Sequence, residues 1–162
     1  MEIKAAGITF YKLEKTNKFF LFTIDSKNKL WDIGGKHEEE DINPLETAIR
    51  EWTEEVNPFL QNEIKIEDLK KYVENVHIEE FYVPKAKYMI YICKAPPFLE
   101  NQEINNEPME IDGKMRQTLW LSKKDVNEFI LNNNISPRLW KKEFLNKFKQ
   151  CYFTELSLSS QK

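Results

Sequence analysis

The chain has 162 residues and a formal net charge of −3, and 41% of its residues are hydrophobic and 13% aromatic. This apolar content is enough for one domain with a substantial core, while the acidic balance argues against binding nucleic acid through overall charge. Two distant cysteines without a CxxC pair exclude a disulfide framework and a thiolate zinc site, and no apolar run reaches the ~20 residues of a membrane span.

Three strands are predicted before the first glycine pair. Residues 2–11 alternate apolar and polar side chains, residues 19–24 form a buried apolar run after a polar turn, and residues 30–33 form a short third strand. The small residues 5–7 of the first strand either leave room for a ligand or allow close strand packing, and the sequence does not decide between the two. The third strand leads into a glycine pair at 34–35, where missing side chains permit close backbone approaches.

A helix is predicted from Pro44 to Val56. Its apolar residues recur at helical spacing and form one face that can be buried: Leu45, Ala48, Ile49, Trp52 and Val56. Asn43 is expected to cap the helix with Pro44 at the first helical position, and Asn57 is expected to end it in a left-handed conformation.

Three glutamates lie beside the apolar face of this helix. Glu51, Glu54 and Glu55 stand at i, i+3 and i+4, so their carboxylates converge within one turn. An acidic trio is more often a solvated face, but the glycines upstream, Arg50 beside the trio and the flanking strands favour a site. A hard divalent cation such as Mg²⁺, or alternatively Mn²⁺, would relieve the repulsion, and Arg50 is expected to bridge to an acid in the preceding loop.

The middle of the chain is predicted to hold a weak helix and a hairpin. Residues 64–72 show loose helical periodicity, and residues 73–83 and 88–94 are rich in β-branched and aromatic side chains, as paired strands are. Residues 98–114 are expected to form a long acidic loop. Loops of this length in a compact domain are usually functional or disordered.

The last third is predicted to hold a strand and two helices. Residues 115–121 form the strand, and Ser122 caps a helix that runs to residue 132. A final helix is expected from Ser136 to about Phe153, with aromatic residues every fourth position and cations on its other faces. Such a helix could bind RNA or an anionic lipid surface, but packing against the core is the favoured interpretation.

The stretch from Gly34 to Pro58 resembles the Nudix box: a glycine, five residues, an acid, seven residues, REUxEE, one residue and a glycine. The matching residues are Gly35, Arg50, Glu51, Trp52, Glu54 and Glu55. Three positions depart from the pattern: the loop acid is Asp41, eight residues separate it from Arg50, and Asn57 replaces the closing glycine. The aspartate and the longer spacing look similar to those of the coenzyme A branch of the family.

The resemblance implies an α+β Nudix fold, in which a mixed β-sheet is packed between helices as an α/β/α sandwich. It also implies Mg²⁺-dependent hydrolysis of a nucleoside diphosphate linked to another moiety. The implied metal ligands are Glu51, Glu54 and Glu55 with the Gly35 carbonyl, the implied catalytic residues are Glu54, Arg50 and Glu110, and the implied substrate-binding residues are Gly34, Gly35 and Lys36. Glu110, like Glu107, represents a long-loop acid that would share the role of general base with Glu54.

The substrate stays open between small nucleotide derivatives and capped RNA. A catalytically weak Nudix-like module that binds nucleotide or RNA is the alternative, and an interaction protein acting through its basic helix is a third. The intact REUxEE argues against a dead copy, because three repelling glutamates have no reason to stay together without a metal. We expect a cytoplasmic protein without membrane contact, with one domain over residues 1–155 and a disordered tail over 156–162. The sequence leaves its oligomeric state open.

Overall fold

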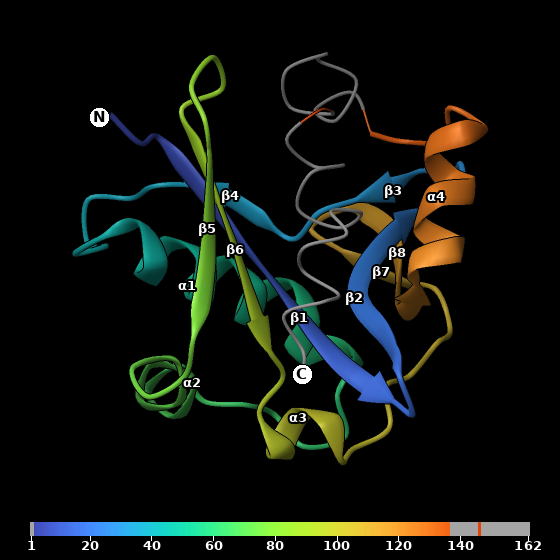
Figure 1. Ribbon diagram of the computed structural model, residues 1–162, viewed down its shortest axis with the longest axis horizontal. Helices are drawn as coiled ribbons and strands as arrows, with labels where there is room; N and C mark the ends of the chain where they lie inside the picture. The colour runs from blue at the N-terminus through green and yellow to red at the C-terminus, as the bar shows by residue number, and fades with distance from the viewer. Residues whose placement is uncertain (1, 137–145, 147–162) are drawn as a thin grey trace.

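The computed structural model of the chain describes residues 2–136 and residue 146. Its centre is a mixed sheet with the strand order β5-β6-β1-β2-β8-β7, to which β3 is added beside β2 and β4 beside β1 (Figure 1). The strands are β1 Ala5–Glu14, β2 Asn17–Asp25, β3 Leu30–Trp31, β4 Gly34–Lys36, β5 Ile78–Val83, β6 Tyr88–Lys94, β7 Met109–Ile111 and β8 Lys114–Ser122. Strands β1 and β6 run parallel, whereas β1–β2, β2–β8, β5–β6 and β7–β8 run antiparallel.

Helices cover both faces of this sheet. They are α1 Pro44–Val56, the 3-10 helix η1 Asn57–Phe59, α2 Ile66–Val73, α3 Pro97–Glu100 and α4 Lys123–Leu131. Helices α1 and α2 share one hydrophobic core cluster with β1 and β6, and α4 joins a second cluster on the opposite face with β2, β6 and β8. The predicted α+β architecture, a mixed sheet packed between helices, is confirmed.

Helix α1 forms as its sequence predicts. The Asn43 side chain accepts a hydrogen bond from the Glu46 backbone N–H at 2.9 Å, and Pro44 occupies the first turn. Trp52 is fully buried and meets the ring of Phe10 on β1 edge-on, with ring centroids 5.2 Å apart. Burying a large apolar side chain contributes about 1.5–3 kcal/mol. The apolar face therefore fixes α1 against β1 and holds its glutamates at the edge of the sheet.

The predicted left-handed end of α1 is wrong. Asn57 has a right-handed conformation with φ −51°, and the chain continues into η1, in which Pro58 occupies the first turn. The Asn57 side chain instead binds the backbone of Ile64 in both directions: its Nδ2 donates to the carbonyl at 2.9 Å, and its Oδ1 accepts from the N–H at 3.0 Å. Asparagine is used here for its amide group and not for its tolerance of positive φ.

The segment 98–114 is not the long structureless loop that was predicted. It contains most of α3 and all of β7, and Asp112 and Gly113 link β7 to β8 with φ values of +52° and +78°. Two central residues with positive φ are what a two-residue hairpin turn requires. The strand predicted at 73–83 is also shorter than expected, because Val73 still belongs to α2 and pairing begins at Ile78.

Helix α4 begins with the predicted serine cap. The Ser122 hydroxyl oxygen accepts from the Asp125 N–H, and the Asp125 carboxylate accepts from the Ser122 N–H, each at 3.1 Å. Val126 and Ile130 are buried against the sheet, as expected. The helix predicted from Ser136 to Phe153 and the tail predicted at 156–162 lie outside the described residues. Among the helices that the structure describes, none combines the length and the apolar content needed to cross a membrane.

Candidate active site

The candidate site begins at a close approach of backbone between β1 and β4. Gly7 pairs with Gly34, and Ala6 pairs with Gly35. A Cβ atom on Gly34 would collide with the Tyr88 hydroxyl oxygen and would lie 2.6 Å from both the Ala6 carbonyl oxygen and the Gly7 Cα. Of the two interpretations left open for the small residues of the first strand, close strand packing is therefore the one observed at Gly7.

Gly35 lies directly against the carboxylate of Glu51. A Cβ atom on Gly35 would stand 2.5 and 2.6 Å from the two Glu51 carboxylate oxygens, so only glycine leaves this space to the acid. The Glu51 side chain is 22% exposed, and burial raises its pKa while the neighbouring Arg50 acts in the opposite direction. The site therefore holds a partly desolvated carboxylate against the backbone of the glycine strand.

Arg50 ties the loop before α1 to the helix and to β4. Its Nε and Nη2 donate to the two carboxylate oxygens of Asp41 at 3.0 Å each, and Nη2 also donates to the Lys36 carbonyl oxygen at 2.9 Å. Asp41 is 8% exposed and also accepts from the Glu38 N–H at 2.8 Å and from the Thr47 hydroxyl at 2.9 Å. The hydrogen bonds from Arg50 hold the pKa of Asp41 well below its usual range. The predicted link between Arg50 and Asp41 is present.

The three glutamates of the box form ion pairs with two arginines. Nη1 of Arg50 lies 3.0 Å from Glu51 Oε2 and 3.1 Å from Glu54 Oε1. Glu55 is 8% exposed and accepts from Nη1 of Arg116 on β8 at 3.2 Å. Within the part of the chain that the structure describes, no three His, Cys, Asp or Glu side chains form a cluster that could hold a metal.

Arg116 is the site residue that sequence reasoning missed. It stands 61 positions after Glu55 in the sequence, on a strand that was predicted, but nothing local indicates which face of the sheet its side chain occupies. The register of β8 against β2 and β7 decides this, because it places Arg116 opposite Asp25 on one side and Met109 on the other. Only the assembled sheet brings the arginine to the helix.

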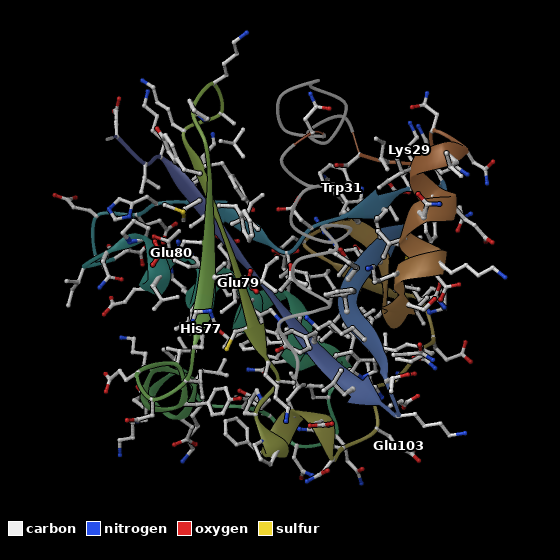
Figure 2. All side chains as sticks on the ribbon, viewed as in Figure 1. Lys29, Trp31, His77, Glu79, Glu80 and Glu103 are labelled. Atoms are coloured by element: carbon white, nitrogen blue, oxygen red, sulfur yellow. The ribbon has the colours of Figure 1, made fainter. Side chains whose placement is uncertain are left out.

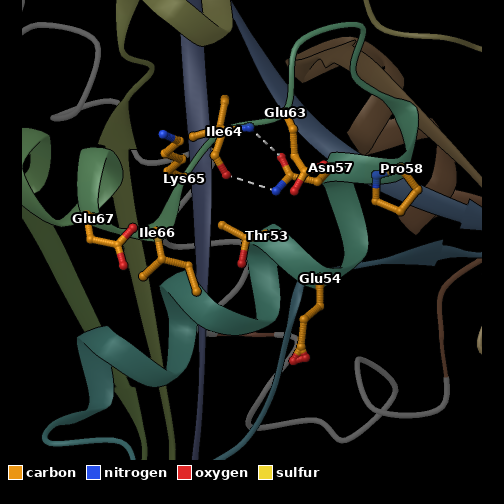
Figure 3. Close-up of a pocket in the computed structure, with 9 residues that line it drawn as sticks. All are labelled: Thr53, Glu54, Asn57, Pro58, Glu63, Ile64, Lys65, Ile66 and Glu67. Carbon is orange, nitrogen blue, oxygen red and sulfur yellow. Dashed lines mark hydrogen bonds between the residues drawn. The ribbon is translucent and has the colours of Figure 1, made fainter.

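Glu54 stands at the rim of a pocket beside the end of α1. The pocket has a volume of about 520 Å³, and its lining includes Thr53, Asn57 and Ile64. Figure 3 shows the two hydrogen bonds between Asn57 and Ile64, which both line this pocket, and the Glu54 carboxylate directed away from Asn57. The Glu54 side chain is 52% exposed, so its carboxylate is accessible to water.

The remaining predicted site residues lie apart from this helix face or contribute backbone. Lys36 is exposed and offers its carbonyl oxygen to Arg50. Glu110 is exposed on β7, opposite Met115, whereas its neighbour Met109 faces Arg116. Since side chains alternate along a strand, Glu110 projects from the other face of the sheet than Arg116. Its role as a shared base stays a prediction.

A glycine strand packed on the acidic face of a helix, at the edge of a mixed sheet between helices, defines an α+β sandwich, and more narrowly the chain has the Nudix fold. A NUDIX hydrolase structure from Listeria monocytogenes matches with a TM-score of 0.56 at 12% identity, over 97% of this chain and 95% of that one. The Ap4A hydrolase of C. elegans matches with a TM-score of 0.49 at 18% identity, over 93% and 98%. No protein-family model and no curated protein match the sequence.

Proposed function

We propose that this chain is a divalent-metal-dependent hydrolase that cleaves the pyrophosphate bond of a nucleoside diphosphate linked to another moiety. The contact between Gly35 and the Glu51 carboxylate carries this proposal. It joins the two halves of the Nudix box pattern, a glycine strand and an acidic helix, and Arg50 holds them together through Asp41 and Lys36. An ordinary solvated acidic face has no need for such a connection.

By chemical type the oxygen donors of this site suit a hard divalent cation, although in this structure Arg50 and Arg116 hold the three carboxylates and no three-acid cluster forms among the described residues. Glu51, Glu54 and Glu55, with the Gly35 carbonyl, would hold Mg²⁺ or Mn²⁺, since carboxylate and carbonyl oxygens are the ligands that these ions take. When bound, such an ion neutralises pyrophosphate oxygens and lowers the pKa of a bound water. Arg116, which balances the charge of Glu55, carries further N–H donors suited to phosphate oxygens, whereas the five N–H donors of Arg50 are engaged within the site.

The residues of the chain divide the remaining work. Glu54, half exposed at the rim of its pocket, would orient or deprotonate the attacking water, and Glu110 is the second candidate for that base. Gly34 and Gly35 let the backbone of β4 approach a phosphate chain, and the Lys36 side chain adds a positive charge beside it. Arg50 positions the loop and the helix relative to one another.

Substitution of the glutamates tests the assignment. Glu54→Gln and Glu55→Gln should each lower turnover by about two orders of magnitude or more while the far-ultraviolet circular dichroism stays that of the wild type. Glu74→Gln, at an exposed position just after α2, is the matched control. The assay follows phosphate products from capped RNA, diadenosine polyphosphates, ADP-ribose, coenzyme A and oxidised nucleoside triphosphates with Mg²⁺ or Mn²⁺. Near-normal rates in either glutamate variant would defeat the assignment.

A nucleotide-binding module without turnover is the second candidate. The observation in its favour is the ion pair between Glu55 and Arg116, which occupies one of the three carboxylates. The same panel separates the two functions, because a module would bind nucleotides without any metal-dependent release of products. The panel includes capped RNA because an RNA substrate and a small nucleotide derivative are separate possibilities for the hydrolase.

A further inference from the structure

A second pocket, of about 500 Å³, lies between the β2–β3 turn and the β7–β8 hairpin. Volumes of this size are typical of small-molecule sites. We name it the Trp31 pocket, after the residues of its lining that matter here: Asp25, Lys27, Lys29, Trp31, Lys114 and Arg116. Figure 2 shows Lys29 and Trp31 at the β3 end of the sheet, away from Glu79 and Glu80 on the edge strand β5.

Strand register places this pocket on the same face of the sheet as α1. Thr23 of β2 pairs with Trp31 on one side and with Thr118 on the other. Directly paired residues project from the same face, and so do residues two apart along a strand, so Arg116 shares the face of Trp31. Arg116 lines the pocket and also binds Glu55 of α1. The pocket is therefore contiguous with the candidate active site.

The indole of Trp31 has a fixed orientation within the pocket. Its Nε1 donates to Asp25 Oδ2 at 2.8 Å, and the other Asp25 oxygen accepts from the backbone N–H groups of Lys27 and Lys29 at 2.9 and 3.0 Å. These bonds fix the turn and the ring together. Over the ring stand the Lys114 ammonium at 6.0 Å and the Arg116 guanidinium at 5.9 Å from its centroid, at the outer limit of a cation–π contact.

The pocket is positively charged in an acidic chain. Four cationic side chains line it against one carboxylate, that of Asp25, although the whole chain has a net charge of −3. One residue of the lining has a spare polar group: the buried Nε of Arg116 has no hydrogen-bond partner among the described residues. An aromatic surface, several cations and a spare N–H donor match a ligand that combines an aromatic ring with phosphates.

We propose that the Trp31 pocket binds the nucleotide portion of the substrate, with the base against the Trp31 indole and phosphate oxygens at Lys114 and Arg116. This inference rests on the proposed function, since it takes the substrate to be a nucleotide. Arg116 then serves as the link between the two regions, because the side chain that holds Glu55 also lines the pocket. The reacting pyrophosphate would extend from this pocket toward Glu51 and Glu54.

Equilibrium binding without turnover tests this proposal. Isothermal titration calorimetry in EDTA would compare ATP with tripolyphosphate, which has the phosphates but no base. Lys114→Glu should weaken the binding of both probes by about tenfold or more, because it reverses a charge in the pocket. Trp31→Leu should weaken the binding of ATP alone, by about fivefold or more, because base–aromatic stacking contributes a free energy of that size. Trp31→Phe keeps an aromatic ring and should therefore bind ATP nearly as well as the wild type. Lys124→Glu, on the exposed side of α4, is the control and should change neither.

Each result decides one part of the proposal. Equal effects of Lys114→Glu and Lys124→Glu would overturn the phosphate assignment, and equal loss of both probes in Trp31→Leu would overturn the base assignment. Failure of the wild type to bind either probe at millimolar concentration would overturn both. If the wild type hydrolyses a substrate but the variants bind both probes unchanged, the pocket proposal is wrong and the proposed hydrolase function stands. If binding depends on Lys114 but no substrate is hydrolysed, the pocket proposal stands and the proposed hydrolase function is wrong.

Discussion

Replacement of Asp41 by asparagine changes the side-chain volume little but should weaken the connection between the box loop and helix α1. The asparagine keeps one acceptor oxygen but loses the charge and the second acceptor, so the bidentate contact with Arg50 is lost. The carboxylate also accepts from the Glu38 N–H and the Thr47 hydroxyl. The substitution therefore disturbs most of the contacts that hold the loop.

The expected cost follows from burial. Removing one partner of a buried ion pair costs about 3–5 kcal/mol, and a hydrogen bond to a charged group contributes about 1.5–3 kcal/mol. The Arg50 side chain is 20% exposed and keeps contacts with Glu51 and Glu54, so water and these acids replace part of the loss. We expect Asp41→Asn to lower the free energy of unfolding by about 2–3 kcal/mol. Asp112→Asn, in the exposed hairpin turn with φ +52°, is the control and should change it by less than about 0.5 kcal/mol.

Urea unfolding measured across pH checks both the size and the cause of this effect. The folded-state pKa of Asp41 lies below its ordinary value of 3.8, so its stabilisation is fully present above that value and is lost as the pH falls through the folded-state pKa. The difference in unfolding free energy between wild type and Asp41→Asn should thus be constant near neutral pH and shrink below about pH 4. Equal urea midpoints at pH 7, or a difference that persists unchanged into acid, would refute the reasoning.

Two further substitution series follow from the same geometry. Gly34→Ala places a Cβ atom against backbone of Ala6 and Gly7 and should cost more than about 2 kcal/mol in urea unfolding. Gly35→Ala meets only the end of the Glu51 side chain, so it should cost much less stability yet lower metal-dependent turnover by about tenfold or more; similar stability losses in the two variants would contradict this contrast. Asn57→Ala removes two hydrogen bonds to the Ile64 backbone and should cost about 2 kcal/mol, whereas Asn106→Ala, at an exposed loop position, should cost almost nothing; equal urea midpoints in these two would remove the structural role given to Asn57.

The parts of the fold with local signals could be predicted from the sequence. Helix α1 carries its own periodicity, its cap at Asn43 and its proline, and the capping box of Ser122 and Asp125 marks α4 in the same way. The link between Arg50 and Asp41 followed from the box pattern, because it joins residues of one loop and the helix after it. Signals that lie within about ten residues need no knowledge of the sheet.

The hairpin between β7 and β8 shows a local signal that was available but not used. Asp112–Gly113 is a preferred pair for a two-residue hairpin turn, and residues 109–111 before it pair with the strand after it. Because acidic residues surround this pair, the segment was predicted to be a loop and not a hairpin. The left-handed end assigned to Asn57 failed for a different reason, since the amide found a long-range partner in Ile64 that fixes a right-handed conformation.

Contacts that depend on sheet register could not be predicted at all. Arg116 reaches Glu55 because β8 lies between β2 and β7 with one particular pairing, and a shift of one residue would turn the arginine to the opposite face. The Trp31 pocket depends on the same register, since its two sides come from a turn after β2 and a hairpin before β8. The proposed nucleotide subsite therefore lies in a part of the chain that the box pattern does not cover.

The lengthened box loop shows how an aspartate can stand where a glutamate is usual. Asn43 fixes the start of α1, so the extra residue has to be accommodated between Gly35 and that cap. A turn does this: the Asp41 N–H donates to the Glu38 carbonyl oxygen at 2.9 Å, while the Asp41 carboxylate accepts from the Glu38 N–H. Because the turn carries the backbone of Asp41 toward the helix, the shorter acid still presents both oxygens to Arg50. Arg50 keeps its contact with β4, and Gly35 stays against Glu51, so the departures from the box pattern leave its two halves joined.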